Sequence, residues 1–288
     1  YASVRLALAP VTGKVLLNES ADNTKQRVLA TDLDGTLIPL PGNPDNRVDL
    51  ETLRACIAKH GLELIYVTGR HLASVLAAIH EHQLPTPDWI ICDVGSSVYQ
   101  RDSRDTFASV DKYREPLGSL IQACPIDQLK ELLADLPELQ LQESEKQGTF
   151  KLSYYTDASV LSDVSGRIRE KLARLQAPYS LIDSVDPFNG QGLIDLLPRD
   201  VSKQFALRWW SRHRQVAYER IVFAGDSGND WAALTSGCRA ILVGNASREL
   251  ATRVEAACRD HDTVCLYLAQ GHATSGVLEG CRWFNLVE

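Results

Sequence analysis

The stretch VLATDLDGTL, residues 28–37, constrains the fold more than any other part of the chain. Its apolar start predicts a β-strand at Val28–Ala30, and two acids, Asp32 and Asp34, follow one residue apart. Side chains two residues apart share one face of a strand, so both carboxylates should leave its carboxyl end toward the same space. Open parallel sheets place their ligands at that end. An ordinary Asp-Gly turn after a strand is the alternative interpretation.

Apolar strands and amphipathic helices alternate after this stretch. We expect a helix capped by Asp49, a strand at Leu62–Val67, a helix from about Leu72 and a strand at Trp89–Val94. This rhythm predicts a parallel sheet with crossover helices. The same pattern resumes near the carboxyl end, with strands expected at Leu193–Leu197, Ile221–Ala224, Arg239–Val243 and Thr263–Tyr267.

The pattern differs between about residues 111 and 190, where helices and paired strands indicate a separate α+β unit. Two polar segments, Gln100–Thr106 and Ser184–Gly192, the second of which contains Pro and Gly, are interpreted as its hinges. The predicted division is an N-terminal arm and linker at 1–27, a first core part at 28–108, the inserted unit at 109–191 and a second core part at 192–288.

Composition narrows the range of functions. The 288 residues carry a formal net charge of -7, which does not suggest nucleic-acid binding. No apolar run approaches the roughly 20 residues that span a bilayer, and no signal peptide is evident, so we expect no membrane association and a cytoplasmic location. The seven cysteines are scattered without a CxxC pair, a distribution typical of free thiols in a reducing compartment.

Three further polar features are expected at strand ends or helix starts of the same sheet. They are Thr68 in VTGR, Lys203 at the start of a helix, and Asp226 and Asp230 in GDSGND. Each has an ordinary interpretation: a turn, a solvated helix lysine and an acidic turn. Their order and shared placement with the two acids of the first motif favour one common site.

Several aspartates around one lysine are suited to phosphoryl transfer. Carboxylate oxygens bind Mg²⁺, which also binds phosphate, and close carboxylates repel each other without a cation. A lysine and a threonine hydroxyl can hold phosphoryl oxygens as charge shifts. An aspartate can act as a covalent nucleophile, and a second acid can protonate the leaving oxygen and then activate water.

The segments DLDGTL, VTGR, a lysine and GDSGND resemble, in that order, the four motifs of the haloacid dehalogenase superfamily of aspartate-nucleophile phosphatases. The resemblance covers about residues 28–284 and implies a Rossmann-like parallel-sheet core with an inserted α+β cap. The blocks DVGSSVY, KLSYY and IDLLPRDVSKQFAL resemble sucrose-phosphate phosphatases. Ser97 stands where that family usually has an acidic residue, which leaves the identity of the sugar open.

The resemblance implies roles for individual residues. Asp32 would be the nucleophile and Asp34 the general acid and base. The implied phosphate-binding residues are Thr68, Gly69, Lys203 and Asn229. The implied Mg²⁺ site comprises Asp32, the Asp34 carbonyl, Asp226 and Asp230, the last directly or through water. Substrate contacts are predicted for Arg70 and Lys151, with a polar helix start and a cap-strand core position as the ordinary alternatives.

The expected function is a Mg²⁺-dependent phosphomonoesterase that hydrolyses a sugar phosphate, such as sucrose 6-phosphate, through an aspartyl-phosphate. Two alternatives remain: a phosphosugar mutase, and a non-catalytic regulatory domain of a glycosyltransferase that binds sugar phosphates. The arm at 1–27 resembles the junction in fused proteins, so a sugar-phosphate synthase, fused or separate, is the expected partner besides the small-molecule substrate.

Overall fold

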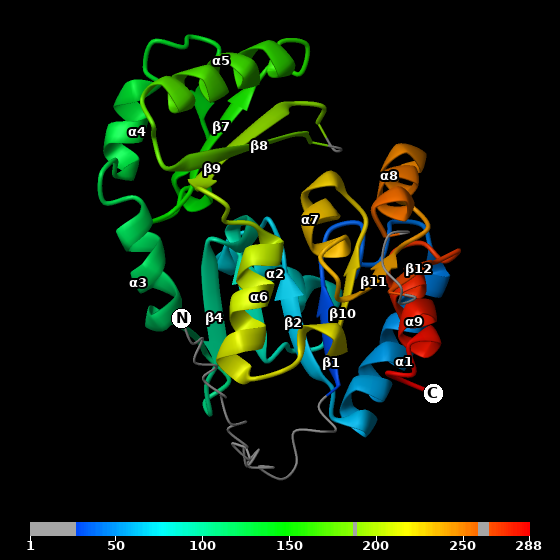
Figure 1. Ribbon diagram of the computed structural model, residues 1–288. Coiled ribbons are helices and arrows are strands. Elements are labelled where there is room, and N and C mark those ends of the chain that lie inside the picture. The colour runs from blue at the N-terminus through cyan, green and yellow to red at the C-terminus, as the bar shows by residue number, and fades with distance from the viewer. Residues whose placement is uncertain (1–26, 187–188, 259–264) are drawn as a thin grey trace, which may run out of the picture.

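The computed structural model describes residues 27–186, 189–258 and 265–288, and in this part of the chain two β-sheets lie one above the other (Figure 1). The large sheet has eight strands in the order β12-β11-β10-β1-β2-β3-β4-β5, and β12 to β3 run parallel. The small sheet has the order β6-β7-β9-β8 and is antiparallel. The predicted α/β fold with a second α+β unit is confirmed, whereas the predicted arm lies outside the described residues.

The elements of the large sheet follow the predicted alternation. Its strands are β1 (Val28–Thr31), β2 (Glu63–Val67), β3 (Trp89–Cys92), β4 (Ser97–Arg101), β5 (Phe107–Ser109), β10 (Ile221–Gly225), β11 (Arg239–Leu242) and β12 (Leu266–Leu268). The helices around it are α1 (Pro44–His60), α2 (Leu72–His82), α3 (Asp111–Leu120), α6 (Lys203–Arg214), α7 (Trp231–Leu234), α8 (Arg248–Cys258) and α9 (Thr274–Trp283). The expected Asp49 cap is wrong, because the Asn43 side chain accepts from the Asn46 N–H and α1 begins at Pro44.

Alternate residues of β1 build two separate hydrophobic layers. Val28 and Ala30 belong to a buried cluster that includes Trp210 of α6. Leu29, which points to the opposite face, belongs to a cluster that includes Leu53 of α1 and other α1 and α9 side chains. Helices therefore cover both faces of the sheet, which leaves the carboxyl ends of its parallel strands as the accessible polar edge.

One predicted strand belongs to the other sheet. Leu193–Leu197 was expected to begin the second core part, but β9 (Gly192–Pro198) lies between β7 and β8 in the small sheet. That sheet consists of β6 (Gln140–Leu141), β7 (Leu152–Thr156), β8 (Tyr179–Val185) and β9, with α4 (Ile126–Leu132) and α5 (Leu161–Arg174) in the same unit. An apolar run of this length predicts a strand and carries no information about its partners, which explains the error.

Both predicted hinges are hairpin connections. Gln100–Thr106 overlaps the end of β4 and the turn before β5, and Ser184–Gly192 joins β8 to β9, where Val185 pairs with Gly192. Polar turn residues such as Asp and Ser, which both segments contain, are compatible with a hinge as well as with a hairpin turn. The chain instead returns from the small sheet to the large one between β9 and α6. The domain boundaries stay predictions.

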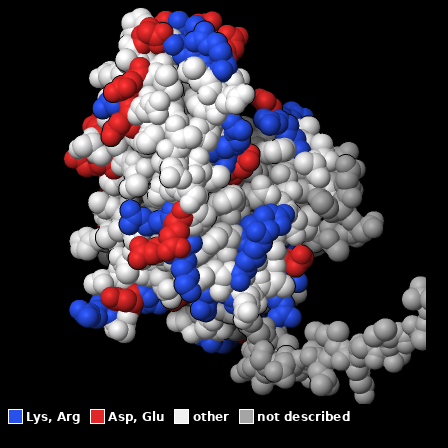
Figure 2. Space-filling view, turned by 60° about the vertical axis from the view of Figure 1, so that its left-hand side comes forward, with Lys and Arg blue, Asp and Glu red and all other residues white. Residues whose placement is uncertain are grey.

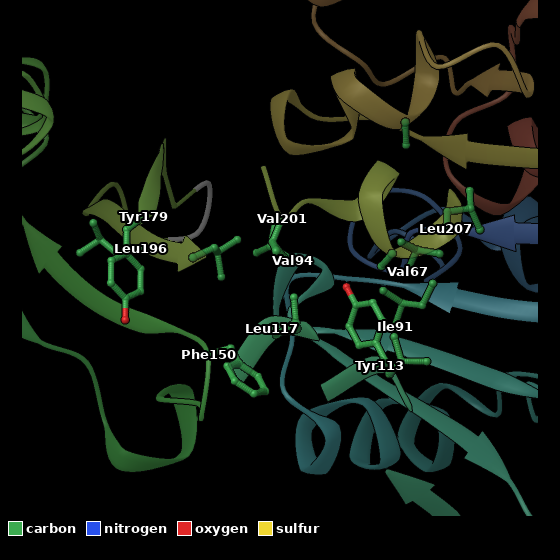
Figure 3. Packing of buried hydrophobic residues seen from close by; sticks show 14 of the residues in the cluster. Val67, Ile91, Val94, Tyr113, Leu117, Phe150, Tyr179, Leu196, Val201 and Leu207 are labelled. Carbon is green, nitrogen blue, oxygen red and sulfur yellow. The ribbon is translucent and has the colours of Figure 1, made fainter. Parts of the chain in front are cut away.

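The two units pack together through apolar side chains. Figure 3 shows Val94 beside Val201 and Phe150 of the small-sheet unit near Leu117 of α3. All four are buried in one hydrophobic cluster that continues into both units. In Figure 2, acidic and basic side chains are interspersed over this face of the molecule. Among the described residues, we find no helix with the length and apolar character that a membrane span requires.

Candidate active site

The predicted site residues converge where the chain changes direction in the large sheet. The chain runs from β1 outward to β2 and β3 and later returns to β10 on the other side of β1. Asp32 follows β1, Thr68 follows β2 and Asp226 follows β10, so all three leave adjacent strands at one edge. A crevice at such a topological switch point is the usual ligand position in open α/β sheets.

Lys203 links two of the predicted aspartates. Its Nζ lies 2.9 Å from Oδ1 of Asp32 and 2.7 Å from Oδ1 of Asp230, and its side chain is fully buried. Lys203 is the first residue of α6, which the Ser202 side chain caps by accepting from the Phe205 N–H. Gly95, with φ +103°, allows the loop after β3 to touch this helix start, because a Cβ there would lie 2.2 Å from the Ser202 carbonyl oxygen.

Asp226 faces the first motif from the neighbouring strand. Its Oδ1 accepts a 2.7 Å hydrogen bond from the hydroxyl of Thr36. Gly35 has φ +74°, and a Cβ at this position would lie 2.5 Å from Oδ2 of Asp226. The glycine of the DxDGT motif is therefore needed both for its backbone conformation and for the close approach of the two loops.

Asp230 has partners for both carboxylate oxygens. Oδ1 accepts from Lys203, and Oδ2 accepts from the backbone N–H groups of Asp226 and Ser227, each at 3.1 Å. The hydroxyl of Ser227 also donates to Oδ2 at 3.1 Å. Asp230 is fully buried, and these bonds hold the GDSGND loop in shape. This set of partners favours a supporting role over a direct ligand role.

The charges of this cluster do not balance. One oxygen from each of Asp32, Asp226 and Asp230 lies within 4.8 Å of the other two. Burial raises the pKa of Asp32 well above its usual value despite Lys203, and burial and Asp230 raise the pKa of Asp226 to about 6. Burial alone would lower the pKa of Lys203, but the two aspartates outweigh it and raise that pKa. Three carboxylates against one ammonium leave a deficit of positive charge that a divalent cation fits.

Asp34 is the more exposed of the two acids that follow β1, with 40% of its side chain accessible against 6% for Asp32. Its carboxylate accepts two hydrogen bonds from Arg70, at 2.7 Å from Nε and 2.6 Å from Nη2. Thr68 is fully buried, and its hydroxyl accepts from the Arg70 N–H at 3.2 Å. Gly69 lies close to Asn229, since a Cβ on Gly69 would approach the Asn229 Nδ2 to 4.0 Å. The predicted phosphate-binding residues are thus neighbours, and their roles stay predictions.

Lys151 reaches the site from the small-sheet unit. It precedes β7, is buried, and its Nζ lies 3.5 Å from the Gly69 carbonyl oxygen. The same Nζ is 3.5 Å from Oδ1 of Asp93 and 3.8 Å from Oδ1 of Asp195. Asp195 also accepts a 2.5 Å hydrogen bond from the Ser153 hydroxyl. The predicted substrate contacts Arg70 and Lys151 both lie beside the Thr68–Gly69 turn.

Sequence reasoning missed Thr36, Asp93 and Asp195. Thr36 was part of the first motif but had no assigned role. Asp93 follows a strand of the parallel sheet, a position that was a usable signal. Asp195 lies in β9, and its approach to Lys151 depends on the pairing of β7 with β9, which no local pattern predicts.

Comparisons with known proteins agree with this fold. The family model described as sucrose-6F-phosphate phosphohydrolase matches residues 25–285. The mannosylfructose-phosphate phosphatase of Agrobacterium fabrum is 27% identical over 90% of this chain and 97% of its own length. The glucosylglycerol-phosphate synthase of Pseudomonas anguilliseptica is 30% identical over 75% of this chain, which corresponds to only 26% of that protein. The sucrose-phosphatase of Synechocystis, solved with sucrose and phosphate, superposes with a TM-score of 0.72 at 23% identity and covers 91% of this chain and 98% of that one.

Proposed function

The chain belongs to the sucrose-6F-phosphate phosphohydrolase family of haloacid dehalogenase phosphatases, and from this membership we propose that it hydrolyses a disaccharide phosphate through an aspartyl-phosphate. The observation that carries the proposal is the buried cluster at the end of β1. There Asp32 lies 2.9 Å from Lys203 and shares a potential cation site with Asp226.

In the first step, an Oδ of Asp32 attacks phosphorus as the bond from phosphorus to the sugar oxygen breaks. The carboxyl group of Asp34 gives its proton to that leaving oxygen. In the second step, the Asp34 carboxylate takes a proton from water, whose oxygen attacks phosphorus and releases Asp32. Both acids come from the same turn after β1, so one loop presents the nucleophile and the proton donor together.

Lys203 orients Asp32 and supplies positive charge next to the phosphoryl group. Thr68, the Gly69 backbone and Asn229 bind phosphoryl oxygens. Lys203 is held between Asp32 and Asp230 before substrate arrives, so no side-chain reorganisation is needed to place its charge. Preorganised donors of this kind stabilise a transition state better than groups that must first be ordered.

Asp32, Asp226 and the Asp34 carbonyl would hold Mg²⁺, with Asp230 supporting the metal loop. All of these donor atoms are oxygens, and the negative charge of the aspartates is larger than the positive charge of Lys203. Both properties fit a hard divalent ion. When bound, Mg²⁺ supplies charge neutralisation between the anionic nucleophile and the anionic phosphate.

The sugar is proposed to lie between the large sheet and the small sheet. Lys151 of the small-sheet unit reaches the Gly69 carbonyl oxygen with its Nζ. The carboxylates of Asp93 and Asp195 lie beside the same Nζ and are hydrogen-bond acceptors. Such groups suit the hydroxyls of a sugar. The relatives include a mannosylfructose-phosphate phosphatase and a glucosylglycerol-phosphate synthase, whose names refer to a disaccharide phosphate and a glycosyl-glycerol phosphate. The match to part of that synthase supports a fused or separate synthase as the source of the substrate.

The test is phosphate release from a panel of esters with Mg²⁺, comprising sucrose 6-phosphate, mannosylfructose phosphate, glucosylglycerol phosphate, glucose 6-phosphate and fructose 6-phosphate. We expect turnover of at least one disaccharide phosphate and none with the Asp32→Asn variant. Conversion of glucose 1-phosphate to glucose 6-phosphate without free phosphate would instead establish a mutase. Binding of sugar phosphates without any turnover by the wild type would establish a regulatory domain and contradict the proposal.

A further inference from the structure

Arg70 engages Asp34 in a paired contact. Nε lies 2.7 Å from Oδ2 and Nη2 lies 2.6 Å from Oδ1, so each carboxylate oxygen has its own donor. The remaining nitrogen, Nη1, reaches Ser74 in the first turn of α2, at 3.2 Å from its hydroxyl and 3.4 Å from its carbonyl oxygen. The guanidinium therefore connects the DLDGTL motif, which contains Asp34, to helix α2, which follows the VTGR motif.

The backbone fixes both partners of this contact. Arg70 directly follows the Thr68–Gly69 turn, and its N–H donates to the buried Thr68 hydroxyl. Asp34 lies in the turn after β1, which pairs with β2 in register. The Arg70 guanidinium is planar, and its backbone N–H and Nη1 have partners of their own. It therefore restricts the orientation of the Asp34 carboxylate as well as its position, which a flexible lysine ammonium would not do.

We propose that Arg70 is a positioning residue that holds the Asp34 carboxyl group in the orientation that proton transfer requires. This inference rests on the proposed function, in which Asp34 gives a proton to the sugar oxygen as the phosphorus–oxygen bond breaks and later takes one from the attacking water. The contact leaves 40% of the Asp34 side chain exposed, so the carboxyl group remains accessible. When Asp34 carries its proton, the protonated oxygen donates to the leaving oxygen and the other oxygen keeps its hydrogen bond from Arg70.

The role differs from that of a substrate ligand. A residue that binds the sugar stabilises the bound substrate and the transition state equally, so its loss raises KM. A residue that orients a proton donor matters for the first step only when the leaving group needs a proton, so its loss slows that step for poor leaving groups. A sugar alcohol is a poor leaving group, whereas p-nitrophenolate departs without protonation.

The experiment compares the best sugar phosphate of the panel with p-nitrophenyl phosphate in Arg70→Gln and Arg70→Lys variants. We expect Arg70→Gln to lose about tenfold in the rate of the first step on the sugar phosphate, measured at saturating substrate as release of the alcohol in a single turnover, and less than about threefold on the aryl ester. A tenfold loss is a fraction of a full general-acid contribution. Arg70→Lys, which keeps the charge without the fork, should show the same difference between substrates. Arg101→Gln is the matched control, because Arg101 pairs with Asp88 at 2.5 Å at similar exposure and far from β1's carboxyl end.

A double-mutant cycle with Asp34→Asn tests whether Arg70 acts through Asp34. In the Asp34→Asn background, Arg70→Gln should cost less than about twofold on the sugar phosphate, because the group that it positions is already gone. Additive losses, equal losses of the first-step rate on both esters, or a change in KM alone would overturn the inference while leaving the phosphatase proposal intact. Failure of the wild type on both esters would overturn the proposed function and this inference with it.

Discussion

Two buried lysines reach the candidate active site from different units of the molecule, and their surroundings differ. Lys203 contacts Asp32 and Asp230 at 2.9 and 2.7 Å, and all three residues belong to the large-sheet unit. Lys151 comes from the small-sheet unit and approaches Asp93 and Asp195 only to 3.5 and 3.8 Å. Both lysine side chains are almost completely buried, with exposed fractions of 0% and 6%.

The difference in distance follows from how each cluster is built. The partners of Lys203 follow β1 and β10, adjacent strands of one sheet, so backbone pairing determines their separation. Lys151 lies between the loop after β3 and strand β9, which belong to different sheets. A contact between two units tolerates small changes in their spacing. The Lys203 cluster is therefore suited to chemistry that every substrate shares, and the Lys151 cluster to recognition of the sugar.

Asp32→Asn tests the shared chemistry and should have the largest effect. An amide does not attack phosphorus, so we expect activity on sugar phosphates and on p-nitrophenyl phosphate to fall by at least about a thousandfold. The asparagine keeps the shape and can still accept from Lys203, so the far-UV spectrum and the unfolding midpoint should change little. Activity that survives on the aryl ester would show that Asp32 is not the nucleophile.

Chelation of Mg²⁺ should reduce kcat by about a hundredfold or more on both classes of ester. Mg²⁺ at about 100 times its Kd should also raise the free energy of unfolding by about 2.7 kcal/mol, because it binds only the folded chain. Calorimetry of Asp226→Ala should show no such increase, whereas Lys151→Met should keep it, since Lys151 lies outside the aspartate cluster. A Mg²⁺ response that requires Lys151 would contradict the separation of the two clusters.

Stability should distinguish the two lysines directly. Lys203→Met leaves two buried carboxylates without their cation, and breaking a buried pair in this way costs about 3–5 kcal/mol. Lys151→Met removes longer contacts, one of them to the partly exposed Asp195, and should cost about 1–2 kcal/mol. Urea unfolding without Mg²⁺ measures both values. Equal losses, or a larger loss for Lys151→Met, would show that contact distance is not the relevant difference.

The large-sheet cluster was predictable from the sequence because each of its loops directly follows an apolar strand. Parallel strands end at one edge, so Asp32, Thr68 and Asp226 could be placed together without knowledge of the packing. Lys203 was predictable through its position at the capped start of a helix.

The Lys151 cluster was not predictable to the same extent. Its formation depends on the antiparallel pairing of Ser153 with Asp195, two residues that lie 42 positions apart in the sequence. The strand that carries Asp195 has the same apolar pattern as a core strand, so it was placed in the wrong sheet. The hairpin turns before β5 and β9 contain the residues that a hinge also favours, and only long-range pairing distinguishes the two.

Lys151→Met tests recognition and should have the smallest effect of the four changes. Because Nζ lies 3.5 Å from the Gly69 carbonyl oxygen and faces the proposed sugar, we expect KM for the sugar phosphate to rise about tenfold, the value of one lost charged hydrogen bond. The kcat/KM for p-nitrophenyl phosphate should stay within about twofold, because a flat aryl group offers no hydroxyl. Lys146→Met is the matched control, since Lys146 lies in the same unit but pairs with Glu143 at the surface. Equal losses on both esters would place Lys151 in the shared chemistry and remove the distinction between the two lysines.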